Sequence, residues 1–306
     1  MTRHVVQGHF GAADLDNLAS AGGDEEATSF DLVAYEKVLD YGIGAALADL
    51  KSKNVFPSEV ALDLVITAAH VHAADTRISR ATESDDAWTR EIRIVVPVSD
   101  HGRWRAVTPI LQRMLNFLTG DRWTIQFRAR PQPFAQIAPQ PDLIVPPFTS
   151  VSLFSGGLDS LIGAVDHLEA KRVPLLVSHA GEPAVSKAQE GCFDMLKAHY
   201  AASPFERLRT WMSFPKNLVR GVAAEDSTRG RSFLFFALGA FAGAGLRHEF
   251  VLHAPENGLI ALNVPLDQLR LGALSTRTTH PEVSSRFVIF CTATWTNQEL
   301  RYGLPW

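Results

Sequence analysis

With 306 residues, the chain is long enough for about two domains that each bury a hydrophobic core. Its composition, 46% hydrophobic and 20% charged with a net charge of -4, is typical of a soluble globular protein and argues against direct binding of nucleic acid through phosphate contacts. No stretch resembles a signal peptide or reaches the roughly 18 apolar residues of a membrane span, so we expect a cytoplasmic protein that does not bind membranes.

Residues 1–130 are predicted to form a smaller α/β domain. The spacing of apolar residues predicts, in chain order, strand 4–10, helices 30–50 and 57–78, strand 92–96, helix 104–118 and strand 123–127. His70 and His72 lie two residues apart on a helix and point nearly opposite ways, so they cannot share a metal ion. A polar group after them is interpreted as a surface for a partner protein or as a solvated helix end with a salt bridge: Asp75, Arg77, Arg80, Trp88 and Arg90.

Six prolines between residues 131 and 148 predict a semi-rigid extended linker, and we place the domain boundary there. Strands alternate with helices beyond it: strands at 150–154, 173–178, 208–212 and 250–253, and helices at 161–169, 184–200 and 232–246. This alternation predicts right-handed crossovers, a parallel Rossmann-like sheet, and a ligand at the carboxyl ends of its strands.

A glycine-rich turn joins the first strand of this second unit to its first helix, with the sequence Ser155, Gly156, Gly157, Leu158, Asp159 and Ser160. Such a turn presents unpaired backbone N–H groups and the positive end of the helix dipole to one point, where a phosphate binds. Asp159 fits beside phosphates if a Mg²⁺ ion stands between them. The alternative is an ordinary serine-capped helix after a tight turn.

Two more polar clusters lie at or beyond strand ends. His179 follows the second strand, where it contacts a nucleotide or is simply a packed residue. Arg229 and Arg231 flank Gly230 at a helix start, which predicts an anion nearby, either a ligand or the carboxylates of Glu225 and Asp226.

A third cluster is the turn-rich polar stretch after the fourth strand, which is where a ligand loop is expected. Glu256 and Asn257 begin it, and Arg277 and His280 lie in a Ser/Thr-rich run further on. Side chains of these last two types bind a carboxylate and the edge of a base.

The motif S-G-G-x-D-S at residues 155–160 resembles the PP-loop of the ATP pyrophosphatases. Together with residues 74–77, 117–123, 229–233, 256–258 and 274–281, it resembles the QatC family, the QueC-like (7-cyano-7-deazaguanine synthase-like) proteins of the Qat anti-phage defence system. The resemblance covers most of residues 55–281.

This resemblance implies a PP-loop domain of the adenine nucleotide alpha hydrolase (HUP) type at residues 149–281, preceded by the smaller α/β domain. The implied activity is that of an ATP-dependent ligase. With ATP and Mg²⁺, it activates a 7-carboxy-7-deazaguanine-type carboxylate, releases pyrophosphate, and passes the acyl group to ammonia or to an amine of a partner protein. Other Qat-type defence proteins are the implied partners.

The resemblance also implies roles for individual residues. Residues 155–160 and His179 would bind the nucleotide, and Asp159 would also bind Mg²⁺. Arg229 and Arg231 would act on the adenylate together with Asp159. The substrate would contact Glu256, Asn257, Arg277 and His280.

The chain departs from the family pattern at its C-terminal end. QueC-type proteins hold a zinc ion with four clustered cysteines there, whereas this chain has only Cys192 and Cys291, which form no CxxC pair. Residues 282–306 are therefore interpreted as a divergent, truncated tail, in which 287–296 reads as a strand. Two alternatives stay open: a PP-loop tRNA-modifying enzyme, which the acidic charge disfavours, and a nucleotide-binding subunit without catalysis.

Overall fold

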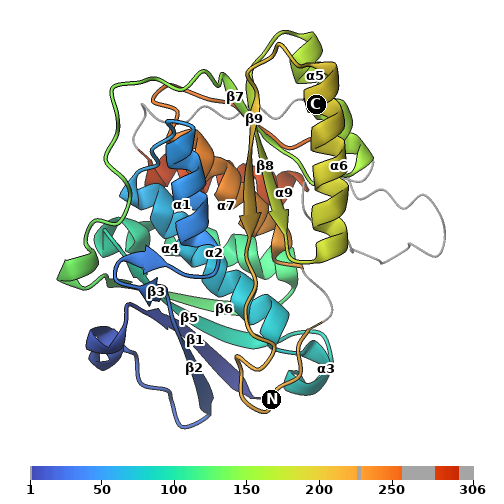
Figure 1. Cartoon of the computed structure of the whole chain (residues 1–306). Helices are drawn as coiled ribbons and strands as arrows, with labels where there is room; N and C mark the ends of the chain where they lie inside the picture. Colours follow the sequence, from blue (N-terminus) through green and yellow to red (C-terminus); the bar gives the residue numbers. More distant parts are fainter. Residues whose placement is uncertain (1, 226–228, 257–279, 296–306) are drawn as a thin grey trace, which may run out of the picture.

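The computed structural model describes residues 2–225, 229–256 and 280–295. Within these ranges the main strands form two parallel four-stranded sheets, with the orders β2-β1-β5-β6 and β10-β7-β8-β9 (Figure 1). The fold is therefore α/β, as predicted. No helix in the described ranges is both long and apolar enough to cross a membrane.

The first sheet is built as the spacing of apolar residues predicts. Its strands are β1 (Arg3–His9), β2 (Glu25–Asp31), β5 (Glu91–Val98) and β6 (Arg122–Ala129), and helices α2 (Glu59–Arg77) and α4 (His101–Thr119) pack against it. Strand β2, the 3-10 helix η1 (Ala12–Asn17) and the short helix α3 (Arg80–Glu83) were not predicted.

The predicted helix 30–50 is wrong over its first half. That stretch contains the end of β2, then β3 (Val33–Tyr35) and β4 (Val38–Leu39), and helix α1 begins only at Ile43 and ends at Ser52. The Asp31 carboxylate accepts hydrogen bonds from Gly11 N and Val33 N, which directs the chain into a turn. Positive φ angles at Glu36 and Tyr41 then exclude a continuous helix.

The second sheet confirms the predicted alternation of strands and helices. Its strands are β7 (Ser150–Leu153), β8 (Pro174–Ala180), β9 (Glu206–Trp211) and β10 (Leu252–His253), joined through α5 (Leu158–Glu169), α6 (Pro183–His199) and α7 (Arg231–Ala244). The chain runs from β7 outward through β8 to β9 and returns on the other side of β7 as β10. This reversal is the switch point at which Rossmann-like sheets bind ligands.

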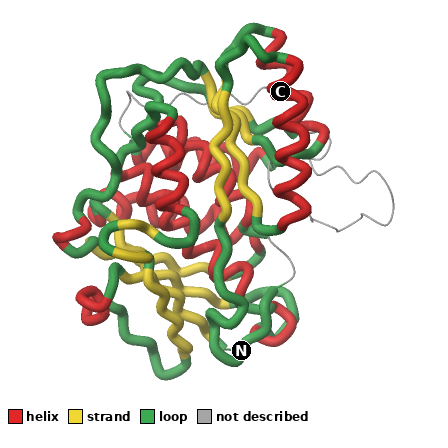
Figure 2. The backbone as a smooth tube through the Cα atoms, viewed as in Figure 1, coloured by secondary structure: helices red, strands yellow, loops and turns green. Residues whose placement is uncertain are grey.

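Helices fill the space between the two sheets. Helix α2 contacts both the first sheet and α7, and α7 packs on β7 and β8, so the two helices form the middle of the molecule (Figure 2). Helices α5 and α6 cover the opposite face of the second sheet over a smaller apolar cluster (Figure 1).

A continuous hydrophobic core joins side chains of both sheets, from Val6 on β1 through Leu64 on α2 and Phe241 on α7 to Val177 on β8. The proline-rich segment 131–148 contains the 3-10 turn η2 (Gln132–Phe134) and otherwise irregular backbone. The division into two domains at this segment stays a prediction.

The strand predicted at 287–296 is wrong, because helix α9 spans Pro281–Thr294. Phe290 packs against Trp104 of α4 with ring centroids 5.7 Å apart, and Phe287 against Phe236 of α7 at 5.2 Å. Val283, Phe287, Phe290 and Thr294 are all buried, and their spacing is that of one helix face. Residues 296–306 lie outside the described ranges.

Candidate functional site

The glycine turn follows β7 directly, at the switch point of the second sheet. Gly156 has φ +80°, and a Cβ atom added there would lie 2.8 Å from Gln189 Cγ and 3.0 Å from Gln189 N. Gln189 of α6 also donates to the carbonyl oxygens of Ser155 (3.3 Å) and His179 (3.0 Å). The position therefore requires glycine, and α6 fixes the turn against the carboxyl end of β8.

Helix α5 begins at this turn with Gly157 as its N-cap, and no side chain of the described residues caps it. The Ser160 hydroxyl donates instead to Gly157 O at 2.8 Å, and the Ser155 and Ser160 hydroxyl oxygens lie 3.2 Å apart. Leu158 projects outward with 71% of its surface exposed. No serine side chain therefore caps α5, although the Ser155 hydroxyl oxygen accepts from Gly157 N at 3.4 Å. The N–H groups of the first turn of the helix stay available to an anion.

Asp159, on the first turn of α5, shares a cleft of about 440 Å³ with Glu256, which follows β10. Partial loss of solvent and the nearby Asp159 charge raise the pKa of the Glu256 carboxyl. Carboxylates that line one cleft supply the oxygen ligands that Mg²⁺ prefers. The described residues contain no group of three or more potential metal ligands, so a Mg²⁺ ion here would also need oxygens from a bound phosphate.

Two histidines in the same cleft were missed by the sequence analysis. The rings of His167 on α5 and His253 on β10 meet edge to face, with centroids 4.2 Å apart. Burial and the proximity of His167 lower the pKa of His253 to about 4, and burial also lowers that of His167. Both rings are therefore neutral near pH 7. Histidines are common on helix faces and at strand ends, so nothing in the sequence marked these two as candidate site residues.

His179 lies within β8 rather than beyond it, and only 1% of its surface is exposed. Its Nε2 donates to Met212 O at 3.2 Å, and its ring packs edge-on against His72 with centroids 5.4 Å apart. Burial, with the nearby His72, lowers the pKa of His179 to about 3. The structure thus places this ring in the core, and the carbonyl bonded to Gln189 ties the residue to the glycine turn.

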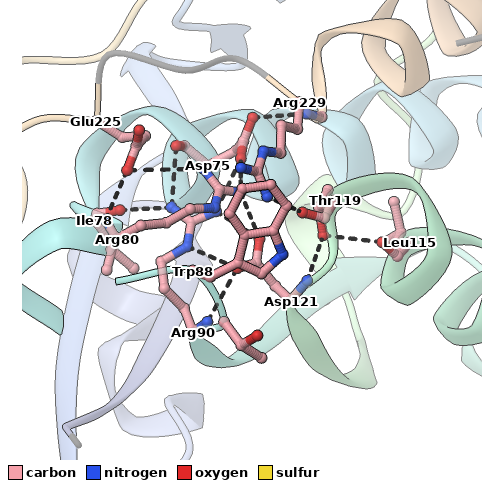
Figure 3. Close-up of polar contacts among 12 residues, drawn as sticks. Asp75, Ile78, Arg80, Trp88, Arg90, Leu115, Thr119, Asp121, Glu225 and Arg229 are labelled. Atoms are coloured by element: carbon pink, nitrogen blue, oxygen red, sulfur yellow. Dashed lines mark hydrogen bonds and ion pairs between the residues drawn. The ribbon is translucent and has the colours of Figure 1, made fainter. Parts of the chain in front are cut away.

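The two arginines predicted to act together lie in different surroundings. Arg229 Nη1 donates to Thr119 O at 3.1 Å, and its guanidinium lies over the Trp88 ring, 3.7 Å from the ring centroid (Figure 3). Arg231, on the first turn of α7, is half-buried and has no ion pair within the described part of the chain. Burial lowers its pKa, an effect that the nearby Glu182 carboxylate opposes. Arg231 is therefore the better placed of the two to bind an anion.

The polar surface predicted for a partner protein is wrong for three of its five residues, which are buried. Asp75, Arg80, Arg90 and Asp121 form what we call the buried ion network (Figure 3). Its two arginines reach Asp121 Oδ2 at 2.7 and 2.6 Å and Asp75 Oδ1 at 3.1 and 2.9 Å. The alternative, a solvated helix end with a salt bridge, is wrong about solvation, since Asp75 and Arg90 have no exposed surface, but the salt bridge is present. Asp121, the second carboxylate that pairs with both arginines, lies far from the other three residues in the sequence.

The remaining predicted site residues lie partly outside the described ranges. His280 caps α9, accepting from Glu282 N at 3.2 Å through Nδ1, and its ring lies 5.0 Å from that of Phe117. Asn257, Arg277 and Asp226 fall in residues that the structure does not describe. The described candidate site thus comprises the glycine turn, Asp159 and Glu256. Arg231, on the first turn of α7, does not line the cleft of Asp159 and Glu256 and stays a candidate anion ligand.

No family model matches the chain, and no curated protein matches it. Among solved structures, the chain is similar to the crystal structure of a ketoreductase domain from the bacillaene assembly line. The match has 8% sequence identity and a TM-score of 0.26, and covers 95% of this chain and 76% of that one. A likeness this low assigns neither a family nor a function to the chain.

Proposed function

We propose that the protein is a QueC-like, ATP-dependent adenylate-forming enzyme of an anti-phage defence system, with a PP-loop at residues 155–160. The observation that carries the proposal is an uncapped glycine turn at the switch point of the second sheet, with the Asp159 carboxylate beside Glu256. The free N–H groups of the turn are suited to bind a phosphate chain, and the two carboxylates are suited to bind a magnesium ion held by that chain.

In the proposed reaction, a carboxylate oxygen of a 7-carboxy-7-deazaguanine-type substrate bonds to the α-phosphorus of ATP. The bond between that phosphorus and the oxygen bridging to the β-phosphate breaks, and pyrophosphate leaves with the electron pair. The N–H groups of the glycine turn hold the departing pyrophosphate, and Arg231 offsets the negative charge that gathers around the α-phosphate. An amine then attacks the acyl carbon, releasing AMP and a proton.

Asp159 and Glu256 are the residues that would hold Mg²⁺. The ion would neutralise charge on the phosphates when it is bound. Binding it would also relieve the repulsion between the two carboxylates, which supports placing the cation between them.

The amine acceptor is ammonia or a side chain of a partner protein, and Qat-type defence proteins are the proposed partners. The leading alternatives within the same fold are tRNA modification and nucleotide binding without catalysis. No described feature favours either of them over adenylation.

Pyrophosphate release from ATP and Mg²⁺, measured with and without 7-carboxy-7-deazaguanine, tests the proposal. We expect release that depends on the deazaguanine and falls about 100-fold in Asp159→Asn, the usual effect of removing one electrostatic stabiliser. Ser155→Ala should lower it as well. Asp166→Asn is the matched control, because Asp166 lines the same cleft two helical turns along α5. Tight ATP binding without any release would contradict adenylation and favour a nucleotide-binding subunit.

A further inference from the structure

The first half of the chain holds the segment that leads into α7 from several sides. Glu225 N donates to Thr76 O at 3.2 Å, and the Glu225 carboxylate accepts from Arg80 N at 2.6 Å. Four residues further on, Arg229 donates to Thr119 O and stacks on Trp88 (Figure 3). These contacts join the end of α2, α3, Trp88 and the end of α4 to Glu225 and Arg229, which precede α7.

Asp75 makes a more direct contact with the residue before α7, and its two carboxylate oxygens have different partners. Oδ1 pairs with the guanidinium groups of Arg80 and Arg90 within the buried ion network. Oδ2 accepts a hydrogen bond of 2.7 Å from Gly230 N. Asp121 pairs with the same two arginines. Its Oδ1 accepts from Arg90 N and Nε instead of from Gly230 N, so among the described contacts of the two carboxylates only those of Asp75 reach Gly230.

Gly230 is packed tightly in this position. A Cβ atom added there would lie 3.1 Å from Asp75 Oδ2 and 3.3 Å from Val71 Cγ1, closer than side chains normally approach. Gly230 has φ -78°, which any residue adopts, so close packing and not backbone conformation favours glycine here. The Asp75 carboxylate therefore sets where the backbone lies at the residue before Arg231.

Arg231 lies at the edge of the second sheet that carries the glycine turn. Its guanidinium is 5.3 Å from the Phe235 ring, which in turn packs on His179 at the end of β8, with centroids 5.7 Å apart. The His179 carbonyl shares Gln189 with Ser155 of the turn. A chain of packed groups thus leads from Asp75 through Gly230 and Arg231 to the proposed phosphate site.

We propose that Asp75 is a positioning residue: its carboxylate fixes the Gly230 amide and so aims Arg231 at the anion bound beside the glycine turn. This inference rests on the proposed function, since it takes nucleotide as the anion. It gives the first half of the chain a part in the reaction, although no residue of that half touches the nucleotide in this scheme. The competing explanation is that the buried ion network only stabilises the fold.

Gly230→Ala separates the two explanations, because its Cβ would force Gly230 and the Asp75 carboxylate apart by a few tenths of an ångström without removing a charge. Gly191→Ala is the matched control: Gly191 lies on α6, and no described atom lies within 4 Å of its added Cβ. We expect Gly230→Ala to weaken MgATP binding about tenfold in titration calorimetry and to raise the KM for ATP more than it lowers kcat. Gly191→Ala should match the wild type.

A second pair of variants tests the carboxylate itself. Asp75→Asn and Asp121→Asn each remove one charge from the buried ion network, and we expect both to lower the melting temperature. Only Asp75→Asn should also weaken MgATP binding in the folded protein. In an Arg231→Ala background, Gly230→Ala should have no additional effect on binding, because the side chain that it misplaces is gone.

The outcomes separate this inference from the proposed function. If pyrophosphate is released and Gly230→Ala binds ATP like Gly191→Ala, the positioning role is overturned and adenylation stands. If ATP binds without release and Gly230→Ala weakens that binding, the positioning role stands and adenylation fails. A wild-type chain that does not bind ATP overturns both.

Discussion

At the scale of single residues, neighbours with the same chemistry have different roles because their surroundings differ. Arg229 and Arg231 are two positions apart, yet one is held by Trp88 and Thr119 O while the other has no ion pair in the described ranges. His70 and His72 differ in the same way. His70 turns to β1, where it accepts from Gly8 N at 2.8 Å, and His72 turns to His179 on β8.

Gly156 provides a residue-scale prediction about the glycine turn. Gly156→Ala should destabilise the protein by more than the roughly 1–2 kcal/mol that a left-handed alanine costs, because its Cβ would also clash with Gln189. Gly221→Ala is the control, since Gly221 has φ +76° and no described atom within 4 Å of an added Cβ. Urea denaturation of both variants measures the difference, and equal losses would show that the turn tolerates a side chain.

At the scale of elements, helix α2 connects the two sheets. It is buried along almost its whole length, with one face on β1 and β5 and another on α7. Polar side chains on it make specific bonds: His70 Nδ1 donates to Ile66 O at 2.7 Å, which leaves Nε2 free to accept from Gly8 N. Asp63 similarly accepts from Trp104 Nε1 at 3.0 Å, joining α2 to α4.

The buried His70 predicts how stability depends on pH. Burial lowers its pKa from 6.5 to about 4, so the folded state resists protonation that the unfolded chain accepts. Its contribution is complete above pH 6.5 and is lost as the pH falls from 6.5 toward 4, by about 3 kcal/mol in total. The free energy of unfolding of His70→Gln should therefore fall less steeply over this range than that of the wild type.

Urea denaturation at several pH values measures this slope, and His101→Gln, at an exposed position on α4, is the control. Because only slopes are compared, a loss of stability that His70→Gln shows at every pH does not affect the result. An unchanged slope in His70→Gln would mean that His70 is not protonated on unfolding in this range.

At the scale of the whole molecule, both sheets share one continuous core through α2 and α7. The buried ion network and the Gly230 amide add polar bonds between the same two halves. The predicted linker at 131–148 is also bonded to the first half, since the Glu59 carboxylate accepts from Ile137 N and Ala138 N. These contacts oppose independent unfolding of the halves.

Hydrogen exchange under native conditions tests whether the halves unfold together. Leu64→Ala removes a fully buried side chain of α2 and should cost about 2–5 kcal/mol. We expect the most protected peptides of β5 and of β8 to lose this amount equally, because the core that Leu64 joins includes both strands. If β8 keeps its wild-type protection, the chain instead consists of two domains that unfold separately, as the proline-rich segment predicts.

Much of the fold could be predicted from local patterns. Strong alternation and helical spacing located β1, β5, β6, α2, α4 and the whole second sheet. The errors lie where local signals were mixed. Residues 30–42 have helix-forming side chains but turn at Asp31 and Tyr41, and residues 287–294 are rich in β-branched and aromatic side chains but pack as a helix on α4. Tertiary contacts there outweigh local propensity.

The sequence by itself determined the glycine turn between a strand and a helix, because its residues are contiguous and their backbone requirements are local. Only the tertiary structure paired Asp159 with Glu256, separated Arg231 from Arg229, and buried Asp75 with Arg80 and Arg90 against Asp121. These outcomes depend on contacts between residues far apart in the chain. The amino-acid type determines the charge of a side chain, but the packing of the two sheets around α2 and α7 determines its partner and its solvent exposure.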